Sequence, residues 1–210
     1  MKDIIIIGAG GHGTEIAWLA RRCNRNIRGF LDDTFEKQGT VIASVKVLGL
    51  IETVDSYQDC EFIIAIGSPR KRKAIVDKYF QSNFYNFATL IDPSAIIGEN
   101  VLVGKGTVLC AGSIVSIDVK IGEHCLVNVN ASISHGSILN DFVTLAPNVS
   151  ISGDVYLHKY VEVGANAVIR EKLLVNNGAV VGMGGVVISD IEENHIVVGN
   201  PAKFLKIVEK

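Results

Sequence analysis

The most regular feature of the chain is an apolar residue at every sixth position between Ile91 and Val186. Sixteen six-residue blocks fill this stretch without an insertion. Their opening residues are Ile91, Ile97, Val103, Leu109, Val115, Ile121, Val127, Ile133, Leu139, Leu145, Ile151, Leu157, Val163, Ile169, Val175 and Val181. Helices and ordinary strands repeat at about 3.6 or 2 residues, so this period indicates a chain that turns a corner after each block.

The fifth position of each block holds a small or β-branched residue, such as Ala95, Thr107 or Gly185, and Leu173 is the large exception. Two inward positions per block suit flat sides joined at tight corners, and three sides close a coil of eighteen residues. We therefore predict an all-β domain, a left-handed parallel β-helix of hexapeptide repeats in which the openers stack into columns.

A different pattern precedes these blocks. The apolar run Ile4–Ile7 predicts a strand buried on both faces, and a glycine-rich turn and a helix ending near Asn24 follow it. Further strands are predicted at about 27–31 and 62–66, and a helix at about 70–80 with Ser68 as its cap and Pro69 at its start. This order predicts a small α/β domain with a truncated, Rossmann-like parallel sheet.

We therefore expect two domains. Residues 1–85 form the Rossmann-like domain, and residues 86–210 form the β-helix with its C-terminal cap. Because the last coil of a β-helix exposes an unpaired strand edge, residues 189–210 are expected to cover it.

Composition mainly excludes classes of partner. With 20 basic and 22 acidic residues the net charge is −2, so no general attraction to nucleic acid or membranes is expected. No apolar run approaches the roughly 18 residues of a membrane span, and the start of the chain is too short and too acidic for a secretory signal. We expect a cytoplasmic protein whose four cysteines, which lack metal-type spacing, are reduced thiols.

Three features together resemble one family: the turn ending in His12-Gly13, the hexapeptide blocks with His135, and the closing segment Val198–Lys203. The chain is similar to bacterial sugar O-acyltransferases of the sialic-acid O-acetyltransferase type. Within that group it most resembles the N-acetyltransferases that modify nucleotide-linked amino sugars in the bacillosamine pathway. The resemblance spans essentially the whole chain and implies acetyl-CoA as the co-substrate.

His135 is the candidate catalytic residue. It occupies the third position of its block, outside the aliphatic column, and a base with a near-neutral pKa suits removal of a proton from an attacking amine. The resemblance implies the role of general base; the alternative is a surface histidine at a coil corner. The family often places an acidic residue next, where this chain has Gly136, so Asp118 and Asp141 are the candidates for orienting the ring.

Metal catalysis is the weaker interpretation of the histidines. A zinc hydrolase of the gamma carbonic anhydrase kind needs three histidines that meet across a subunit boundary. His124, His135 and His158 stand at different positions of their blocks, and no two are separated by a whole number of coils. We therefore predict no metal.

The first domain carries Gly8-x-Gly10-x-x-Gly13, with Asp32 about 20 residues further on, which formally fits a dinucleotide fingerprint. The domain is short for NAD, which stays a lesser alternative, and the glycines could simply permit a tight turn. The resemblance instead implies the diphosphate of a UDP- or dTDP-sugar. The residues that it implies at that site are Gly10, Gly11, His12, Asp32, Asp33, Gly67, Ser68 and Arg72.

The resemblance also implies an acetyl-CoA site between the coils of adjacent subunits. Its expected residues are Thr144, Gly153, Ala165, Gly182, Met183 and Lys203. Glycine at a coil corner is equally expected without a ligand. Flat outer faces favour side-by-side packing, so a homotrimer is expected.

The function predicted from the sequence is acetyl-CoA-dependent N-acetylation of the amino group of a UDP- or dTDP-linked amino-dideoxy sugar. The nearest alternative is O-acetylation of sialic acid or another glycan hydroxyl. A non-catalytic nucleotide sensor, with the coils as an assembly scaffold, is the alternative from another class.

Overall fold

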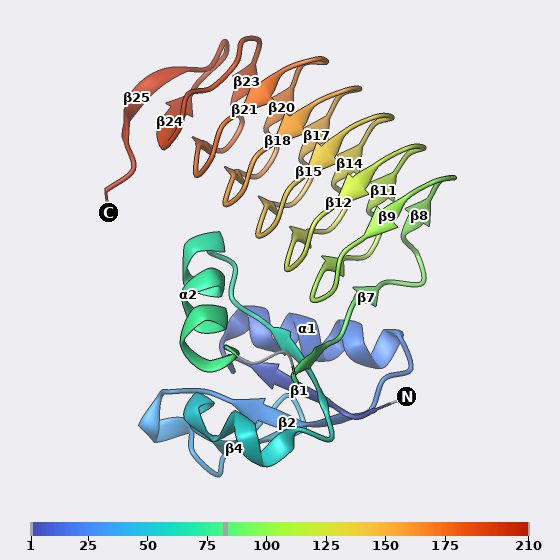
Figure 1. Ribbon diagram of the computed structural model, residues 1–210, viewed down its shortest axis with the longest axis vertical. Helices are drawn as coiled ribbons and strands as arrows, with labels where there is room; N and C mark the ends of the chain where they lie inside the picture. The colour runs from blue at the N-terminus through green and yellow to red at the C-terminus, as the bar shows by residue number, and fades with distance from the viewer. Residues whose placement is uncertain (1, 82–83, 210) are drawn as a thin grey trace. The chain divides into compact units, whose positions relative to one another are not determined.

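A computed structural model describes residues 2–81 and 84–209. The chain divides into two compact units at Leu90 and Ile91 (Figure 1). The predicted domain boundary lies five residues earlier, at 85/86. The structure places the division later because Asn86–Phe87 still pairs with a strand of the first unit.

The first unit is a parallel sheet with helices. Its strand order is β3-β4-β2-β1-β5-β6, and only the pair β3–β4 is antiparallel. The strands are β1 (Ile4–Ile7), β2 (Ile27–Leu31), β3 (Val41–Ile42), β4 (Val45–Gly49), β5 (Glu61–Ile64) and β6 (Asn86–Phe87). The helices are α1 (Gly11–Arg22) and α2 (Pro69–Tyr79), with the 3₁₀ helices η1 (Phe35–Lys37) and η2 (Ile51–Tyr57).

The apolar run of β1 is fully buried at the centre of this sheet, as its sequence predicts. The sequence pattern did not predict β3, β4 and β6. Two of these strands have only two residues each, and β4 mixes Lys46 with apolar neighbours, so none presents a continuous apolar run. The loops after β1, β2 and β5 leave the carboxyl ends of adjacent parallel strands, where open α/β sheets bind ligands.

The second unit is the β-helix, and each of its sides carries one two-residue strand per coil. The first side holds β7 (Leu90–Ile91), β10 (Val108–Leu109), β13 (Leu126–Val127), β16 (Thr144–Leu145), β19 (Glu162–Val163) and β22 (Val180–Val181). The second side holds β8 (Ile96–Ile97), β11 (Ile114–Val115), β14 (Ser132–Ile133), β17 (Ser150–Ile151), β20 (Val168–Ile169) and β23 (Val186–Val187). The third side holds β9 (Leu102–Val103), β12 (Lys120–Ile121), β15 (Ile138–Leu139), β18 (Tyr156–Leu157) and β21 (Leu174–Val175).

All neighbours within a side pair in parallel, with partners eighteen residues apart, as in Leu109↔Val127. The second residue of each strand is the block opener, and from Leu109 onward the openers are buried in one apolar core. Leu173 also packs in that core. The predicted fold class, an α/β domain followed by a left-handed β-helix of hexapeptide repeats, is confirmed.

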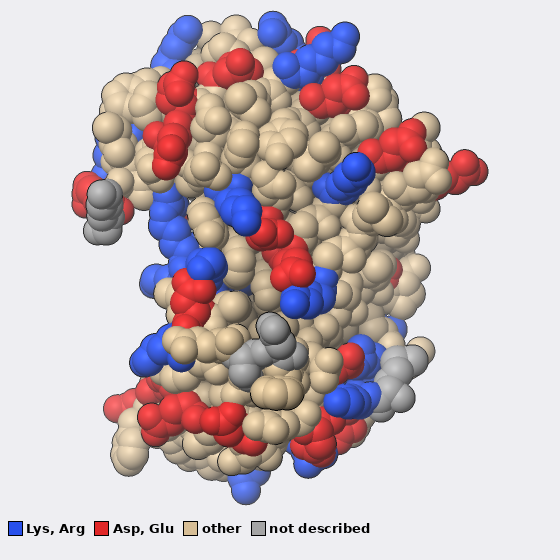
Figure 2. Space-filling model, in the orientation of Figure 1, with Lys and Arg blue, Asp and Glu red and all other residues tan. Residues whose placement is uncertain are grey.

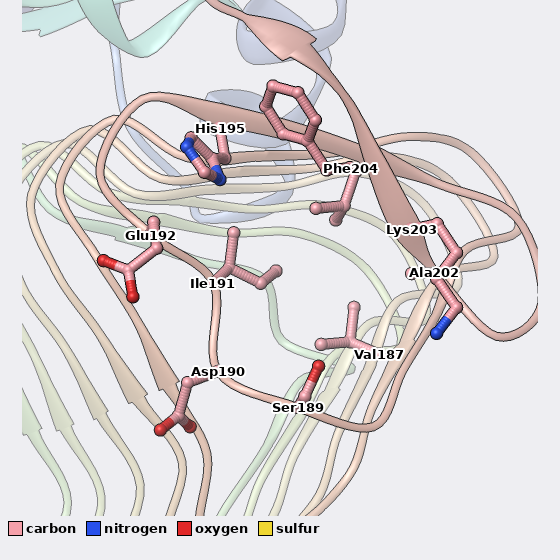
Figure 3. A pocket seen from close by; sticks show the side chains of 10 residues that line it. Val187, Ser189, Asp190, Ile191, Glu192, His195, Ala202, Lys203 and Phe204 are labelled. Atoms are coloured by element: carbon pink, nitrogen blue, oxygen red, sulfur yellow. The ribbon is translucent and has the colours of Figure 1, made fainter.

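The end of the chain continues the stack. β24 (His195–Val198) pairs in parallel with β22, and β25 (Lys203–Ile207) pairs antiparallel with β24. Ile191 and Val197 are buried in the β-helix core. These contacts cover the last coil and border an open pocket of about 200 Å³ (Figure 3).

Acidic and basic side chains are interspersed over the visible surface (Figure 2). Among the residues described, no helix is both long and apolar enough to cross a membrane.

Candidate active site

His135 lies in the turn between β14 and β15, at the corner between the second and third sides of the β-helix. Its side chain is exposed, whereas the neighbouring openers Ile133 and Leu139 are buried. Gly136 completes the turn with φ of +69°, a conformation that glycine adopts without strain. The hexapeptide pattern thus places the imidazole at the outer edge of the coil.

The imidazole ring rests on Gly153 in the next coil. A Cβ atom added to Gly153 would lie 2.5 Å from Cε1 and 2.6 Å from Nε2 of His135. No side chain other than hydrogen would leave the ring in this place. Two of the residues predicted for catalysis and acetyl-CoA binding therefore meet at one corner.

Each of the two carboxylates predicted to orient His135 has another hydrogen-bond partner. Asp118 lies one coil earlier, where its Oδ1 accepts a hydrogen bond of 3.0 Å from Asn100 Nδ2. Asp141 lies at a different corner, between the third and first sides.

The Asp141 carboxylate accepts a hydrogen bond from the backbone N–H of Glu123 (3.0 Å) and pairs with Lys159 Nζ (2.9 Å). Burial opposes ionisation of Asp141, but these two donors lower its pKa below the usual value.

A third carboxylate, which was not predicted from the sequence, lies beside the His135 turn. A Cβ atom on Gly136 would be 2.2 Å from Oδ1 of Asp154. The backbone N–H of Asp154 also donates to the carbonyl of His135 (2.9 Å). The eighteen-residue coil was the available signal, because it places Asp154 directly above Gly136.

The other predicted acetyl-CoA residues lie apart from His135 within one chain. Thr144 is buried on β16, on the first side. Ala165 and Met183 stack at the corner between the first and second sides, where Gly184 N–H donates to the Ala165 carbonyl (2.8 Å) and Gly182 precedes Met183. Lys203 lines the open pocket of the cap with His195, Phe204 and other residues (Figure 3). One protomer therefore offers two separate edges and not one closed acetyl-CoA site.

In the first unit, the glycine-rich turn connects β1 to α1. Gly8 has φ of +101°, and a Cβ atom on Gly13 would lie 2.2 Å from the Gly8 carbonyl oxygen. Both glycines are required by the turn itself. Gly10 and Gly11 have no such conflict, since a Cβ atom on either would meet nothing within 4 Å.

Gly10 is the N-cap of α1 and provides no side-chain cap. His12 Nδ1 lies 3.1 Å from Glu15 Oε2, within the first turn of the helix. The open space at Gly10 and Gly11 and the N–H groups at the start of α1 suit an anion.

Asp32 holds this turn in place. Its Oδ2 accepts a hydrogen bond from the backbone N–H of Ala9 (2.7 Å) and pairs with Lys37 Nζ (3.1 Å), while Oδ1 accepts from Thr34 N–H (2.9 Å). Burial alone would raise the pKa of Asp32, but hydrogen bonds from Thr34, Ala9 and Lys37 lower it to about 2. The carboxylate is therefore ionised and ties the loop after β2 to the loop after β1.

Asp33 is exposed and accepts hydrogen bonds from Ile51 N–H (2.9 Å) and the Tyr79 hydroxyl (3.2 Å). On the other side of β1, the buried Arg72 supports the turn between β5 and α2. Its Nη1 donates to the carbonyls of Ile66 (2.8 Å) and Gly67 (2.7 Å).

Ser68 is the N-cap of α2, although its hydroxyl makes no cap hydrogen bond. The predicted nucleotide residues therefore surround three loops at the same end of the sheet. Contact of these residues with a nucleotide stays a prediction.

The remaining coil histidines pack against aromatic rings. His124 stacks on Phe142 with centroids 5.0 Å apart, and His158 lies 4.6 Å from Tyr156. In the part of the chain that the structure describes, no three His, Cys, Asp or Glu side chains are grouped to hold a metal ion.

The fold is a hexapeptide-repeat β-helix that follows a small α/β domain. At one corner of the β-helix the imidazole of His135 packs on Gly153. Residues 3–79 match the model of the PglD N-terminal domain. UDP-N-acetylbacillosamine N-acetyltransferase of Bacillus subtilis (strain 168) is 32% identical over 114 residues, 53% of this chain. The match spans about half of that relative, 52% of its length.

Two solved structures share the whole fold. The acetyltransferase domain of PglB from Neisseria gonorrhoeae FA1090, in complex with acetyl coenzyme A, has a TM-score of 0.87 at 27% identity and covers 97% of this chain and 99% of its own. PerB from Caulobacter crescentus, in complex with CoA and GDP-perosamine, has a TM-score of 0.89 at 25% identity and covers 98% of both chains. The family resemblance predicted from the sequence is therefore confirmed.

Proposed function

We propose that this chain is an acetyl-CoA-dependent N-acetyltransferase that acetylates the amino group of a nucleotide-linked amino sugar. The observation that carries the proposal is the exposed imidazole of His135, seated on Gly153 at an edge of the β-helix. The names of the relatives support it, since they include a nucleotide-sugar N-acetyltransferase and domains bound to CoA or acetyl-CoA.

In the proposed reaction, the sugar amine attacks the thioester carbonyl of acetyl-CoA. The C–N bond forms first, and the C–S bond breaks when the tetrahedral intermediate collapses. CoA leaves as the thiol after its sulfur takes the proton that His135 has removed from the amine. His135 accepts the proton that the amine loses, and an imidazole exposed at a coil edge can reach an amine brought to that edge. Backbone N–H groups near Gly153 would stabilise the oxyanion of the tetrahedral intermediate.

The proposed nucleotide site is at the loop end of the first sheet. The start of α1 supplies N–H groups and a helix dipole for the diphosphate, with open space over Gly10 and Gly11. Asp33 and His12 are the more accessible side chains there, while Asp32 and Arg72 hold the surrounding loops. The nucleotide is proposed to be UDP or dTDP, and because PerB was solved with GDP-perosamine a guanine nucleotide belongs in the test.

A homotrimer is proposed as the active form. The two edges that carry the predicted acetyl-CoA residues are separate within one protomer, so a groove between neighbouring copies would bring them together. Outward residues of the first coils support such packing, because Ile96 and Leu102 are each 62% exposed.

The test is an acetyl-transfer assay with purified protein, acetyl-CoA and a panel of UDP-, dTDP- and GDP-linked amino sugars, with free sialic acid as the O-acetylation arm. Thiol release should require a nucleotide amino sugar, and the product should be an amide. Replacing His135 by Ala should lower turnover by about 10²–10⁴-fold. His158→Ala, a coil histidine packed on Tyr156, is the matched control and should stay active.

Near-normal turnover in His135→Ala would remove this residue from the mechanism. Turnover with sialic acid alone would favour O-acetylation. Nucleotide-sugar binding without thiol release from acetyl-CoA would instead identify a sensor.

A further inference from the structure

One column of corner residues runs along the edge of the β-helix where His135 lies. Its members are Asn100, Asp118, Gly136, Asp154 and Lys172, eighteen residues apart, all with φ between +56° and +69°. Asn100 donates a hydrogen bond to Asp118, so neighbouring polar side chains of this column interact along the edge. At Gly136 the column has no side chain.

The carboxylate of Asp154 fills the space that Gly136 leaves. Its Oδ1 lies 2.2 Å and its Cγ 3.3 Å from the place where a Cβ atom of residue 136 would be. A carboxylate carried by the next coil therefore stands beside the residue that follows the proposed base.

The same two coil segments hold the imidazole. The His135 ring rests on Gly153, and the backbone N–H of Asp154 donates to the His135 carbonyl at 2.9 Å. Gly153, which the ring contacts, and Asp154, which carries the carboxylate, are adjacent in the chain and therefore move together. Their positions are fixed by the pairing of the two coils.

The Asp154 carboxylate is also free to accept a hydrogen bond from His135. Among the residues that the structure describes, the Asp154 side chain has no hydrogen bond or ion pair, and it is exposed. By contrast, Asp118 is bonded to Asn100, and Asp141 is bonded to Glu123 and Lys159 at another corner.

We propose that Asp154 is the positioning residue for His135 in the reaction given above, and this inference rests on that proposed function. The carboxylate accepts a hydrogen bond from one ring nitrogen and leaves the other free to take the proton of the amine. After transfer, both ring nitrogens carry protons, and the carboxylate stabilises the imidazolium while remaining ionised itself. Rotation of these two exposed side chains about their χ angles would bring the carboxylate to the ring before substrate binds.

The test compares Asp154→Asn with Asp118→Asn, which removes a charge from the same column one coil earlier. Asp154→Asn should lower kcat by about 10–100-fold, with KM for both substrates unchanged, while Asp118→Asn retains wild-type kcat. In Asp154→Gly, whose φ of +58° glycine tolerates, added formate should restore several-fold of the lost turnover. Equal kcat in Asp154→Asn and wild type, or no response to formate, would overturn the proposal.

A second measurement does not depend on turnover. With ¹⁵N-labelled histidine, the tautomer ratio of His135, assigned by comparison with His135→Ala, should change in Asp154→Asn and stay constant in Asp118→Asn. An unchanged ratio contradicts the inference even if the wild-type enzyme proves inactive on every sugar tested. Wild-type inactivity with a changed ratio contradicts only the proposed reaction.

Discussion

Replacing Gly153 by alanine adds one methyl group beside His135. This change should lower turnover while leaving the stability of the fold nearly unchanged. Residue 153 is not in the positive-φ region, so alanine fits the backbone. The new Cβ atom would lie 2.5 Å from Cε1 of His135, and ordinary contact begins at about 3.4 Å. The imidazole must therefore retreat by about 1 Å or adopt another rotamer.

The displaced imidazole is expected to lower the rate of acetyl transfer. A displacement of about 1 Å at a catalytic group lowers turnover by about 10²-fold, which corresponds to roughly 2.7 kcal/mol of transition-state stabilisation. The free energy of unfolding should stay within about 1 kcal/mol of wild type, because the exposed ring can move and alanine restricts the unfolded chain. Initial rates with acetyl-CoA and the best nucleotide amino sugar measure the first quantity, and urea unfolding measures the second.

Gly104→Ala is the contrasting variant. There a Cβ atom would lie 2.5 Å from backbone atoms of Gly122, which cannot rotate away, so stability should fall by about 1–3 kcal/mol. Full turnover in Gly153→Ala would refute the idea that contact with Gly153 positions the His135 ring. A loss of stability as large as that of Gly104→Ala would show that more than a side chain is displaced.

Two predictions concern stability. Since folding lowers the pKa of Asp32 to about 2 from the usual 3.8, its ionised form should stabilise the fold by about 2 kcal/mol above pH 4. This contribution is lost as pH falls from 4 to 2. The stability difference between wild type and Asp32→Asn, measured by circular dichroism, should therefore shrink over that interval. A constant difference would contradict the lowered pKa of Asp32. Ser137 donates to the Ser152 carbonyl (3.0 Å) and accepts from Val155 N–H (3.2 Å) inside the coil, so Ser137→Ala should cost about 1–3 kcal/mol in urea unfolding. An unchanged midpoint would mean that these groups find other partners.

Much of the fold is readable from the sequence because it depends on short-range repetition. A six-residue period of aliphatic openers leaves one arrangement that buries them all, and the openers from Leu109 onward do form one core. The buried strand Ile4–Ile7 and strand Ile27–Leu31 are equally local signals. Strands β3, β4 and β6 were not predicted, because β3 and β6 have only two residues each and β4 mixes Lys46 with apolar residues.

The candidate site was predicted only in part. The sequence singled out His135 and, through the family resemblance, Gly153, but it could not show that the ring rests on that glycine. It suggested Asp118 and Asp141 as partners of the histidine, and in the structure each of these carboxylates has another partner. Asp154 was overlooked because a linear pattern does not say toward which neighbouring coil a corner side chain points.

The sequence by itself determined the period, and with it the β-helix, the corner position of His135 and the small α/β domain before it. Only the tertiary structure decided which groups meet at that corner and which carboxylates are already bonded. The physical reason is that burial of an aliphatic opener depends on its own position in the repeat. The contacts of an exposed polar side chain depend on the coil stacked above or below, eighteen residues away.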